Sequence, residues 1–263
     1  MAALRPEDRT ATDLAGAGEL EALLERIFGS RLSRRGLLAA VQVWQGERGL
    51  YRILDDPAGA PACLHARLAS QAARARADAI LTTSAVLRRH PGLDHRLSGP
   101  SADALAEWRH HELHKPEPPV TLVLAPDDAV EGDSVELEHP VFQHWTRPVI
   151  LTSRQAQWQL ESRAVDLGIE VVGADEPSPS AAVDFLRHAF GAATIALELG
   201  GDPTLFRPPV AVDEVLLSVC QTPQHSGQPF LNALDLAQGF PHHSTPYPLQ
   251  AGADVWRLQR FSR

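Results

Sequence analysis

Three short polar segments come directly after apolar runs, and their residue types are suited to binding a ligand. They are Thr82-Thr83, Thr152-Ser153 and Gly200-Gly201. Hydroxyl groups hydrogen-bond to phosphates and sugars, and glycine lets backbone N–H groups approach a phosphate closely. If the apolar runs are parallel strands, their carboxyl ends meet at one edge of a sheet, where α/β proteins bind ligands. The sequence therefore predicts one shared ligand site at that edge.

The segment from Glu198 to Thr204 carries the clearest signal for phosphate binding. A buried strand over 195–198 precedes the glycine pair, and a short helix is expected to open at Pro203. A strand, a tight glycine turn and a helix N-terminus together present free backbone N–H groups to an anion. Asp202 lies in the same turn and its charge opposes a phosphate, so a plain strand-to-helix turn is the alternative.

Charged side chains near these strand ends are further candidates. Arg88, Arg89 and His90 follow the strand expected over 79–83, and guanidinium groups would hold a substrate phosphate at the mouth of the site. The alternative is a solvated loop. Glu198 ends an otherwise apolar strand, and because an unpaired buried charge is costly, it requires either a protein partner or a ligand.

Strands and helices are expected to alternate along the chain. Apolar or period-two patterns predict strands over 37–44, 79–83, 120–124, 149–152, 169–172, 195–198, 212–219 and 255–261, the last at a sheet edge. Helical periodicity predicts helices over 19–28, 61–77, 102–113, 155–167 and 181–190, and residues 223–252 are expected to form a long irregular loop. This order predicts an α/β fold with a mostly parallel central sheet, helices on both faces and an antiparallel edge strand.

Composition argues against several classes of function. A net charge of −9 opposes nucleic-acid binding, and no apolar run approaches the roughly 20 residues of a membrane helix. Cys63 and Cys220 are too few for a disulfide framework and suit a reducing compartment. The N-terminal segment has acidic residues and lacks the apolar core of a secretory signal. We therefore expect a cytoplasmic protein with neither a nucleic-acid nor a membrane partner.

A histidine-rich segment raises the possibility of a metal site. His110 and His114 are four residues apart and would share a helix face, a spacing found in zinc sites. The glutamate is misplaced for H-E-x-x-H, and no other ligand is evidently paired with the two histidines. We expect a solvated helix end and no metal here, and the same holds for His242-His243.

Four segments in a fixed order suggest a family. They are DAILTTSAVLRRHP (78–91), VELEHPVFQHWTRPVILTS (135–153), ELGGDPTLFRPPVAVDEVLL (198–217) and WRL (256–258). Their order resembles the RibD C-terminal family, the pyrimidine reductases of riboflavin biosynthesis, which has a dihydrofolate-reductase-like fold. The resemblance covers residues 36–263 and leaves 1–35 as an N-terminal extension with one helix.

The resemblance implies an NADPH-dependent reductase that forms a homodimer. Its substrate would be 5-amino-6-(5-phosphoribosylamino)uracil or a related small molecule, which receives a hydride. The residues that the resemblance assigns to cofactor binding are Thr82, Thr83, Thr152, Ser153, Arg154, Glu198, Gly200, Gly201 and Thr204. Within this set, the glycine turn would hold the pyrophosphate, and Ser153 with Arg154 the 2′-phosphate. The residues assigned to the substrate are Gln42, Trp44, Gln45, Arg88, Arg89 and His90.

Departures from the family pattern keep a second function open. The family's S-L-D-G is Val43-Trp44-Gln45-Gly46 here, so an acidic residue has become Gln45. Its G-A-G-T is Thr83-Ser84-Ala85-Val86, and His90 replaces the acidic residue before proline. The alternative is a non-catalytic relative that keeps the fold and binds a nucleotide-like ligand or a protein partner.

Overall fold

The computed structural model of the chain contains two compact units. The first comprises Met1–Arg76, Leu97–Pro116 and Gly200–Arg263, and the second comprises Ala77–Arg96 and Glu117–Leu199. The structure describes residues 5–6, 14–29, 32–46, 49–54, 62–126, 135–143, 145–200, 211–222, 227 and 229–263. The predicted division into 1–35 and 36–263 stays a prediction.

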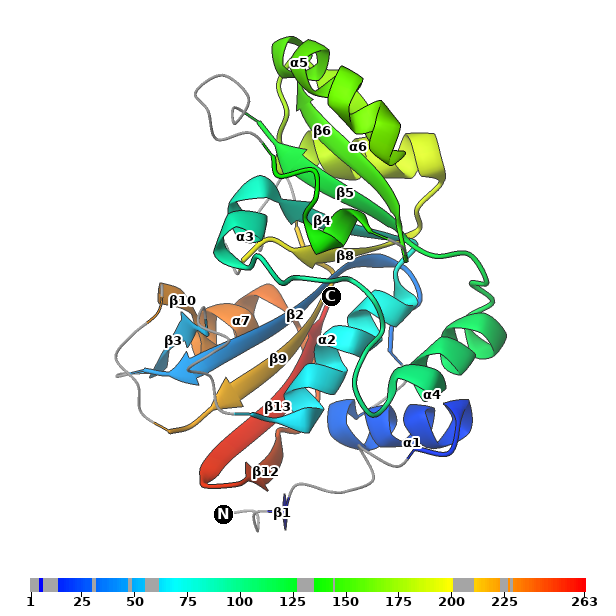
Figure 1. The fold of residues 1–263 in the computed structure, drawn as a ribbon. Helices are drawn as coiled ribbons and strands as arrows, with labels where there is room; N and C mark the ends of the chain where they lie inside the picture. The colour runs from blue at the N-terminus through cyan, green and yellow to red at the C-terminus, as the bar shows by residue number, and fades with distance from the viewer. Residues whose placement is uncertain are drawn as a thin grey trace. The chain divides into compact units, whose positions relative to one another are not determined.

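The second unit is built on a parallel sheet with the strand order β8-β4-β5-β6-β7. Its strands are β4 (Ala79–Thr83), β5 (Val120–Ala125), β6 (Arg147–Ser153), β7 (Glu170–Ala174) and β8 (Thr194–Glu198). Figure 1 shows β4, β5 and β6 side by side. The inner strands β4 and β5 are apolar and almost entirely buried, as expected where helices cover both faces of a parallel sheet.

Helices cover this sheet on two faces. The helical segments are α3 (Ser84–Arg89), η4 (Pro140–Phe142), α5 (Arg154–Ala164), η5 (Val165–Leu167) and α6 (Pro179–Phe190). Leu87 of α3 and Leu160 of α5 share a core cluster with Val123 and Ile150. The connections from β4 to β7 advance across the sheet in one direction, whereas the connection through α6 returns to β8. Because parallel crossovers are right-handed, α6 lies on the face opposite α3 and α5.

The first unit has a mixed sheet. Its strands are β1 (Arg5–Pro6), β2 (Gly36–Gln45), β3 (Leu50–Ile53), β9 (Glu214–Cys220), β10 (Pro229–Asn232), β11 (His242–His243), β12 (Tyr247–Ala251) and β13 (Asp254–Ser262). Strands β2 and β9 pair in parallel, while β13 runs antiparallel to β9 on one side and to β12 and β11 on the other. A second antiparallel group joins β2, β3 and β10.

The helical segments of the first unit are α1 (Ala17–Phe28), α2 (Leu64–Arg76), α4 (Ala102–Glu107), the π-helical turn η3 (Trp108–Glu112) and α7 (Ala233–Gly239). Residues of α1, α2, α4 and η3 pack on the sheet through one apolar cluster. Leu20 and Leu24 of α1 are fully buried and share the cluster with Trp256 and Leu258 of β13. Helix α1 ends at Gly29, whose φ of 83° suits a residue without a side chain.

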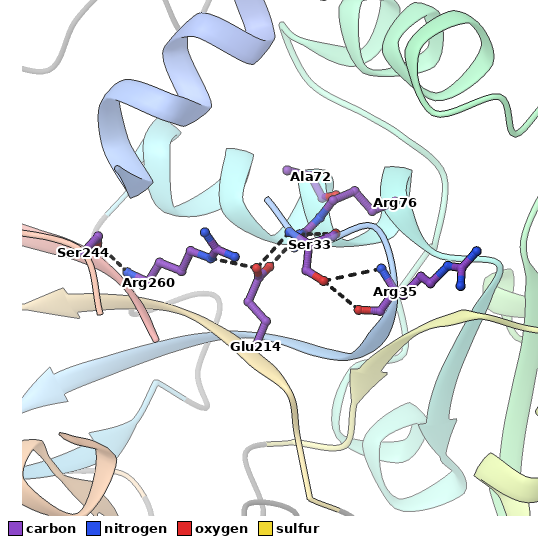
Figure 2. A network of polar contacts seen from close by, with 7 residues as sticks. All are labelled: Ser33, Arg35, Ala72, Arg76, Glu214, Ser244 and Arg260. Carbon is purple, nitrogen blue, oxygen red and sulfur yellow. Dashed lines mark hydrogen bonds and ion pairs between the residues drawn. The ribbon is translucent and has the colours of Figure 1, made fainter. Parts of the chain in front are cut away.

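A buried ion network joins four segments of the first unit. Figure 2 shows the Glu214 carboxylate between two guanidinium groups: Arg76 Nη1 lies 2.5 Å from Oε1, and Arg260 Nε lies 2.7 Å from Oε2. Arg76 Nη1 also donates to the Ser33 carbonyl at 3.0 Å, and the Ser33 N–H donates to Glu214 Oε2 at 3.1 Å. Burial lowers the pKa of Arg76, while the charge of Glu214 and its hydrogen bond oppose this change. Hydrogen bonds of this kind offset the cost of burying the charges, although Arg76 Nη2 is buried and makes no hydrogen bond to the described residues.

The predicted fold class is confirmed, as are most of the predicted helices and strands. Three expectations about the C-terminal region and the helix over 102–113 were wrong. Residues 223–252 include β10, α7, β11 and β12 instead of one irregular loop, and β13 is an interior strand because β12 and β11 pair with it. The helix over 102–113 divides into α4 and η3. The helix expected at Pro203 lies outside the described residues.

Candidate functional site

The carboxyl ends of the parallel strands in the second unit gather the predicted polar residues at one edge. Thr82 of β4 lies opposite Glu198 of β8, and Thr152 of β6 lies opposite Ala125 and Gly173. The chain order of the strands reverses between β8 and β4. Open α/β sheets bind ligands at such a reversal, outside the carboxyl ends of the strands. Glu198 and Thr82 therefore stand where the topology predicts a ligand.

The two predicted residues at this reversal have different surroundings. The Thr82 side chain is buried, and its hydroxyl donates to the Glu198 carbonyl at 2.9 Å, which fixes the ends of β4 and β8 to one another. The Glu198 carboxylate is partly exposed, and its Oε2 lies 3.4 Å from Nε2 of the buried His95. Thr82 thus stabilises the backbone of the site, and Glu198 presents a charge there.

Two helices begin at the same edge. Thr83 accepts from the Val86 N–H as the N-cap of α3, and Ser153 accepts from the Ala156 N–H as the N-cap of α5, each at 3.2 Å. Neither helix has an acidic residue in its first turn. The N-terminus of α5 therefore keeps the positive end of its dipole available to an anion. Thr152, one residue earlier, is buried and donates to the Ala125 carbonyl at 2.6 Å.

Arg154 is the first residue of α5 and is already paired with a carboxylate. Its Nε lies 2.6 Å from Asp175 Oδ1 and its Nη2 lies 3.2 Å from Oδ2. Both side chains are exposed, and the hydrogen bond and charge of Asp175 raise the pKa of Arg154 above its usual value. Because water screens exposed charges, this pair can exchange for another anion.

The predicted phosphate-binding side chains occupy the end of α3. Arg88 and Arg89 are exposed in its last turn, where a cation also suits the helix dipole. His90 caps the helix, and its carbonyl accepts from Nε2 of the buried His139 at 3.1 Å.

The remaining predicted residues belong to the first unit or lie outside the described residues. Gln42 Nε2 donates to the Ala66 carbonyl at 3.5 Å, Trp44 is buried, and Gln45 Oε1 accepts from Gln221 Nε2 at 3.2 Å. Gly200 has a φ of 68°, the left-handed conformation expected of a glycine turn. Gly201 and Thr204 lie outside the described residues, so their predicted role stays a prediction.

Three residues near the site were not among the sequence candidates. His95 and Thr121 gave no signal, because a lone histidine in a loop and a threonine within a strand match no motif. Asp175 gave a weak signal, because it directly follows β7, and dinucleotide-binding α/β folds can use an acidic residue to contact the ribose. In the described parts of the chain, no three His, Cys, Asp or Glu residues are grouped in a way that could hold a metal ion.

No protein-family model matches the chain, and no curated protein matches it. Several solved structures, however, resemble the structure of this chain. A pyrimidine reductase-like protein from Corynebacterium diphtheriae is 17% identical with a TM-score of 0.58, over 91% of this chain and 98% of that one. The riboflavin biosynthesis reductase Rib7 of Saccharomyces cerevisiae is 11% identical with a TM-score of 0.52, over 93% of this chain and all of that one (100%).

RibD of Acinetobacter baumannii is 14% identical with a TM-score of 0.55, over 88% of this chain. The match covers 59% of that protein, so the chain spans less than two thirds of its length. Together these likenesses define the α/β fold of the pyrimidine reductases. The chain has a RibD C-terminal-like fold, and its sequence diverges strongly from those of the three structures. No helix among the described residues is both long and apolar enough to cross a membrane.

Proposed function

We propose that the chain is a nicotinamide-dependent reductase whose cofactor is NADPH. The observation that carries the proposal is the carboxyl edge of the second unit, where Glu198 ends β8 and, three strand positions away at the same end of the sheet, the Ser153 cap and Arg154 follow β6. Reduced nicotinamide would supply the hydride, and the protein would bind and orient the reactants. The shared fold of RibD and Rib7 supports this proposal.

Each part of the edge has a role in the proposal. The N-terminus of α5, with Ser153 and Arg154, would hold the 2′-phosphate of the cofactor, because backbone N–H groups and a guanidinium both bind phosphate oxygens. Arg88 and Arg89 would bind the phosphate of a ribosylamino-pyrimidine or a related small molecule. Glu198 would contact uncharged polar groups of the ligand. A homodimer follows from the resemblance and belongs to the same proposal.

A second candidate is a non-catalytic relative that binds a nucleotide-like ligand or a protein partner. Two observations favour it: Arg154 is paired with Asp175, and the position of the family's acidic residue is Gln45, which is bonded to Gln221. A neutral amide cannot exchange a proton, so the chemistry at that position differs from that of the family.

Calorimetric titration of the purified protein with NADPH and with NADH tests the proposal. We expect NADPH to bind, and Arg154→Gln to weaken its binding about two- to fivefold while leaving NADH binding unchanged, the range for one exposed charge contact. Arg163→Gln is the matched control, because it removes an exposed arginine from the last turn of the same helix, about 13 Å further along. Absence of binding of either nucleotide at millimolar concentration would contradict the reductase and leave the non-catalytic candidate.

A further inference from the structure

A buried row of three side chains lies behind the Glu198 carboxylate. His95 Nε2 lies 3.4 Å from Glu198 Oε2, an ion-pair contact that lacks hydrogen-bond geometry, and Nδ1 of the same ring lies 3.0 Å from Thr121 Oγ1. His95 is 1% exposed and Thr121 is 0% exposed, whereas Glu198 is 22% exposed. The row is therefore closed to water at Thr121 and reaches water through Glu198.

Strand register places Thr121 and Glu198 on the same face of the sheet. Ile80 of β4 lies opposite Thr121 of β5, and Thr82, two residues later, lies opposite Glu198 of β8. Paired residues in a sheet point to the same face, as do residues two apart in one strand. The His95 ring thus connects β5 to β8 across the intervening strand β4.

The segment that carries His95 is held at several points. The Leu93 N–H donates to the His90 carbonyl at 2.9 Å, and this carbonyl also accepts from His139 Nε2. Because His139 Nδ1 accepts from the Val141 N–H, the proton of that ring lies on Nε2 and can be donated. These contacts fix the backbone that positions the His95 ring.

The three groups can accommodate a proton in more than one place. With Glu198 ionised and His95 neutral, Nε2–H lies on the side of the carboxylate and Nδ1 accepts from the Thr121 hydroxyl. Uptake of one proton from water through Glu198 charges the His95 ring, whose Nδ1–H then donates to the Thr121 oxygen, because a hydroxyl can both donate and accept. Transfer of the Nε2 proton from this charged ring to Glu198 leaves a neutral ring whose Nδ1–H still donates to Thr121. A valine in place of Thr121 would support none of these states.

We propose that His95 and Thr121 are positioning residues for Glu198, and that the three side chains form a relay that sets whether Glu198 carries a proton. A carboxyl group controlled in this way binds hydroxyl or amine groups of a ligand and disfavours a second anion at the same point. The sugar hydroxyls of a nucleotide or of a ribosylamino compound have this chemistry. The inference rests on the proposed function for the identity of the ligand, but the relay itself does not depend on it.

The charged residues on either side of His95 in the sequence pair with each other. Arg96 pairs with Asp94 at the surface, and the Arg96 N–H donates to Asp94 Oδ1 at 2.8 Å. The Glu198 carboxylate, at the end of β8, is a charged group 3.4 Å from the His95 ring.

The relay can be tested in the protein without any ligand by ¹⁵N NMR of the histidine rings, with His95→Asn used to assign the signals of His95. In Glu198→Gln, we expect the midpoint of the His95 titration to fall by about one pH unit or more, since a carboxylate at this distance favours the charged ring. Thr121→Val is nearly isosteric and should lower the midpoint by a smaller amount. Thr194→Val, which alters a buried threonine at the amino end of β8, is the matched control and should change nothing.

The outcomes separate the relay from the proposed function. An unchanged His95 titration in both Glu198→Gln and Thr121→Val would overturn the relay, even in a protein that binds NADPH. A lowered midpoint in a protein that binds neither nucleotide would support the relay and contradict the reductase. If Glu198→Gln does not fold, Thr121→Val alone decides, because it removes one oxygen without changing the shape of the side chain.

Discussion

Arg154, the first residue of α5, and Asp175, the residue that follows β7, form an ion pair with two hydrogen bonds. The distances are 2.6 Å and 3.2 Å. In the proposed function, this pair would place an acidic group and a basic group beside the adenosine end of the cofactor. A 2′-phosphate would compete with Asp175 for Arg154, whereas a 2′-hydroxyl could bond to Asp175 itself. If the proposed function holds, the balance between the two residues would determine whether NADPH or NADH is preferred.

Asp175→Asn should increase the preference for NADPH over NADH. The substitution removes the competing carboxylate, so we expect the ratio of the two dissociation constants to shift about three- to tenfold toward NADPH at low salt, and less at high salt, as water and ions screen exposed charges. Calorimetry at two salt concentrations measures this. The neighbouring exposed Glu176, changed to Gln, carries the same change in charge and should leave the ratio as it was. Equal shifts in both variants would contradict a 2′-phosphate at Arg154.

Glu214→Gln should strongly destabilise the protein. The change leaves the Arg76 and Arg260 guanidinium groups without their carboxylate in a buried position, which costs about 3–5 kcal/mol of the free energy of unfolding. Urea denaturation measures the loss. Glu170→Gln breaks the exposed pair with Arg147, and we expect it to cost no more than about 1 kcal/mol. Similar losses in the two variants would show that burial does not govern the cost.

Cys220 should respond to alkaline pH. Burial raises the pKa of its thiol, so the native state holds this proton more tightly than the unfolded chain does. The associated stability is present in full below the unfolded pKa of about 8.5 and is lost as pH rises through the folded value, by up to about 1.4 kcal/mol per pH unit. Denaturation at several pH values should show a steeper alkaline loss for the wild type than for Cys220→Ala. Parallel curves would contradict this assignment.

The strands of the second unit could be predicted from sequence, because they are short apolar runs that polar residues terminate. The run over 79–83 corresponds to β4 without error, since Asp78 precedes it and the Thr83 cap ends it. The C-terminal region could not be predicted in the same way. Helix α7 is short and owes its start to a capping box between Asn232 and Asp235, and β12 includes Pro248, a residue that argues against a strand.

In the candidate site too, features set by neighbouring residues could be predicted from the sequence, whereas contacts between distant segments could not. That the strand ends share one edge followed from the order of elements, and register then placed Thr82 opposite Glu198. The partner of Glu198 could not be predicted, because His95 belongs to an irregular segment and reaches β8 through the folding of the chain. Sequence patterns report periodicity along an element, whereas contacts between distant loops depend on packing.

The three residues of the Arg76–Glu214–Arg260 network are synthesised far apart in time. Glu214 follows Arg76 by 138 residues, and Arg260 follows Glu214 by a further 46. During synthesis on the ribosome, all residues of the second unit emerge before the carboxylate that neutralises Arg76 exists. A nascent or truncated chain that ends before β9 must keep the Arg76 guanidinium in water, so α2 cannot reach its final buried environment before β9 has been made.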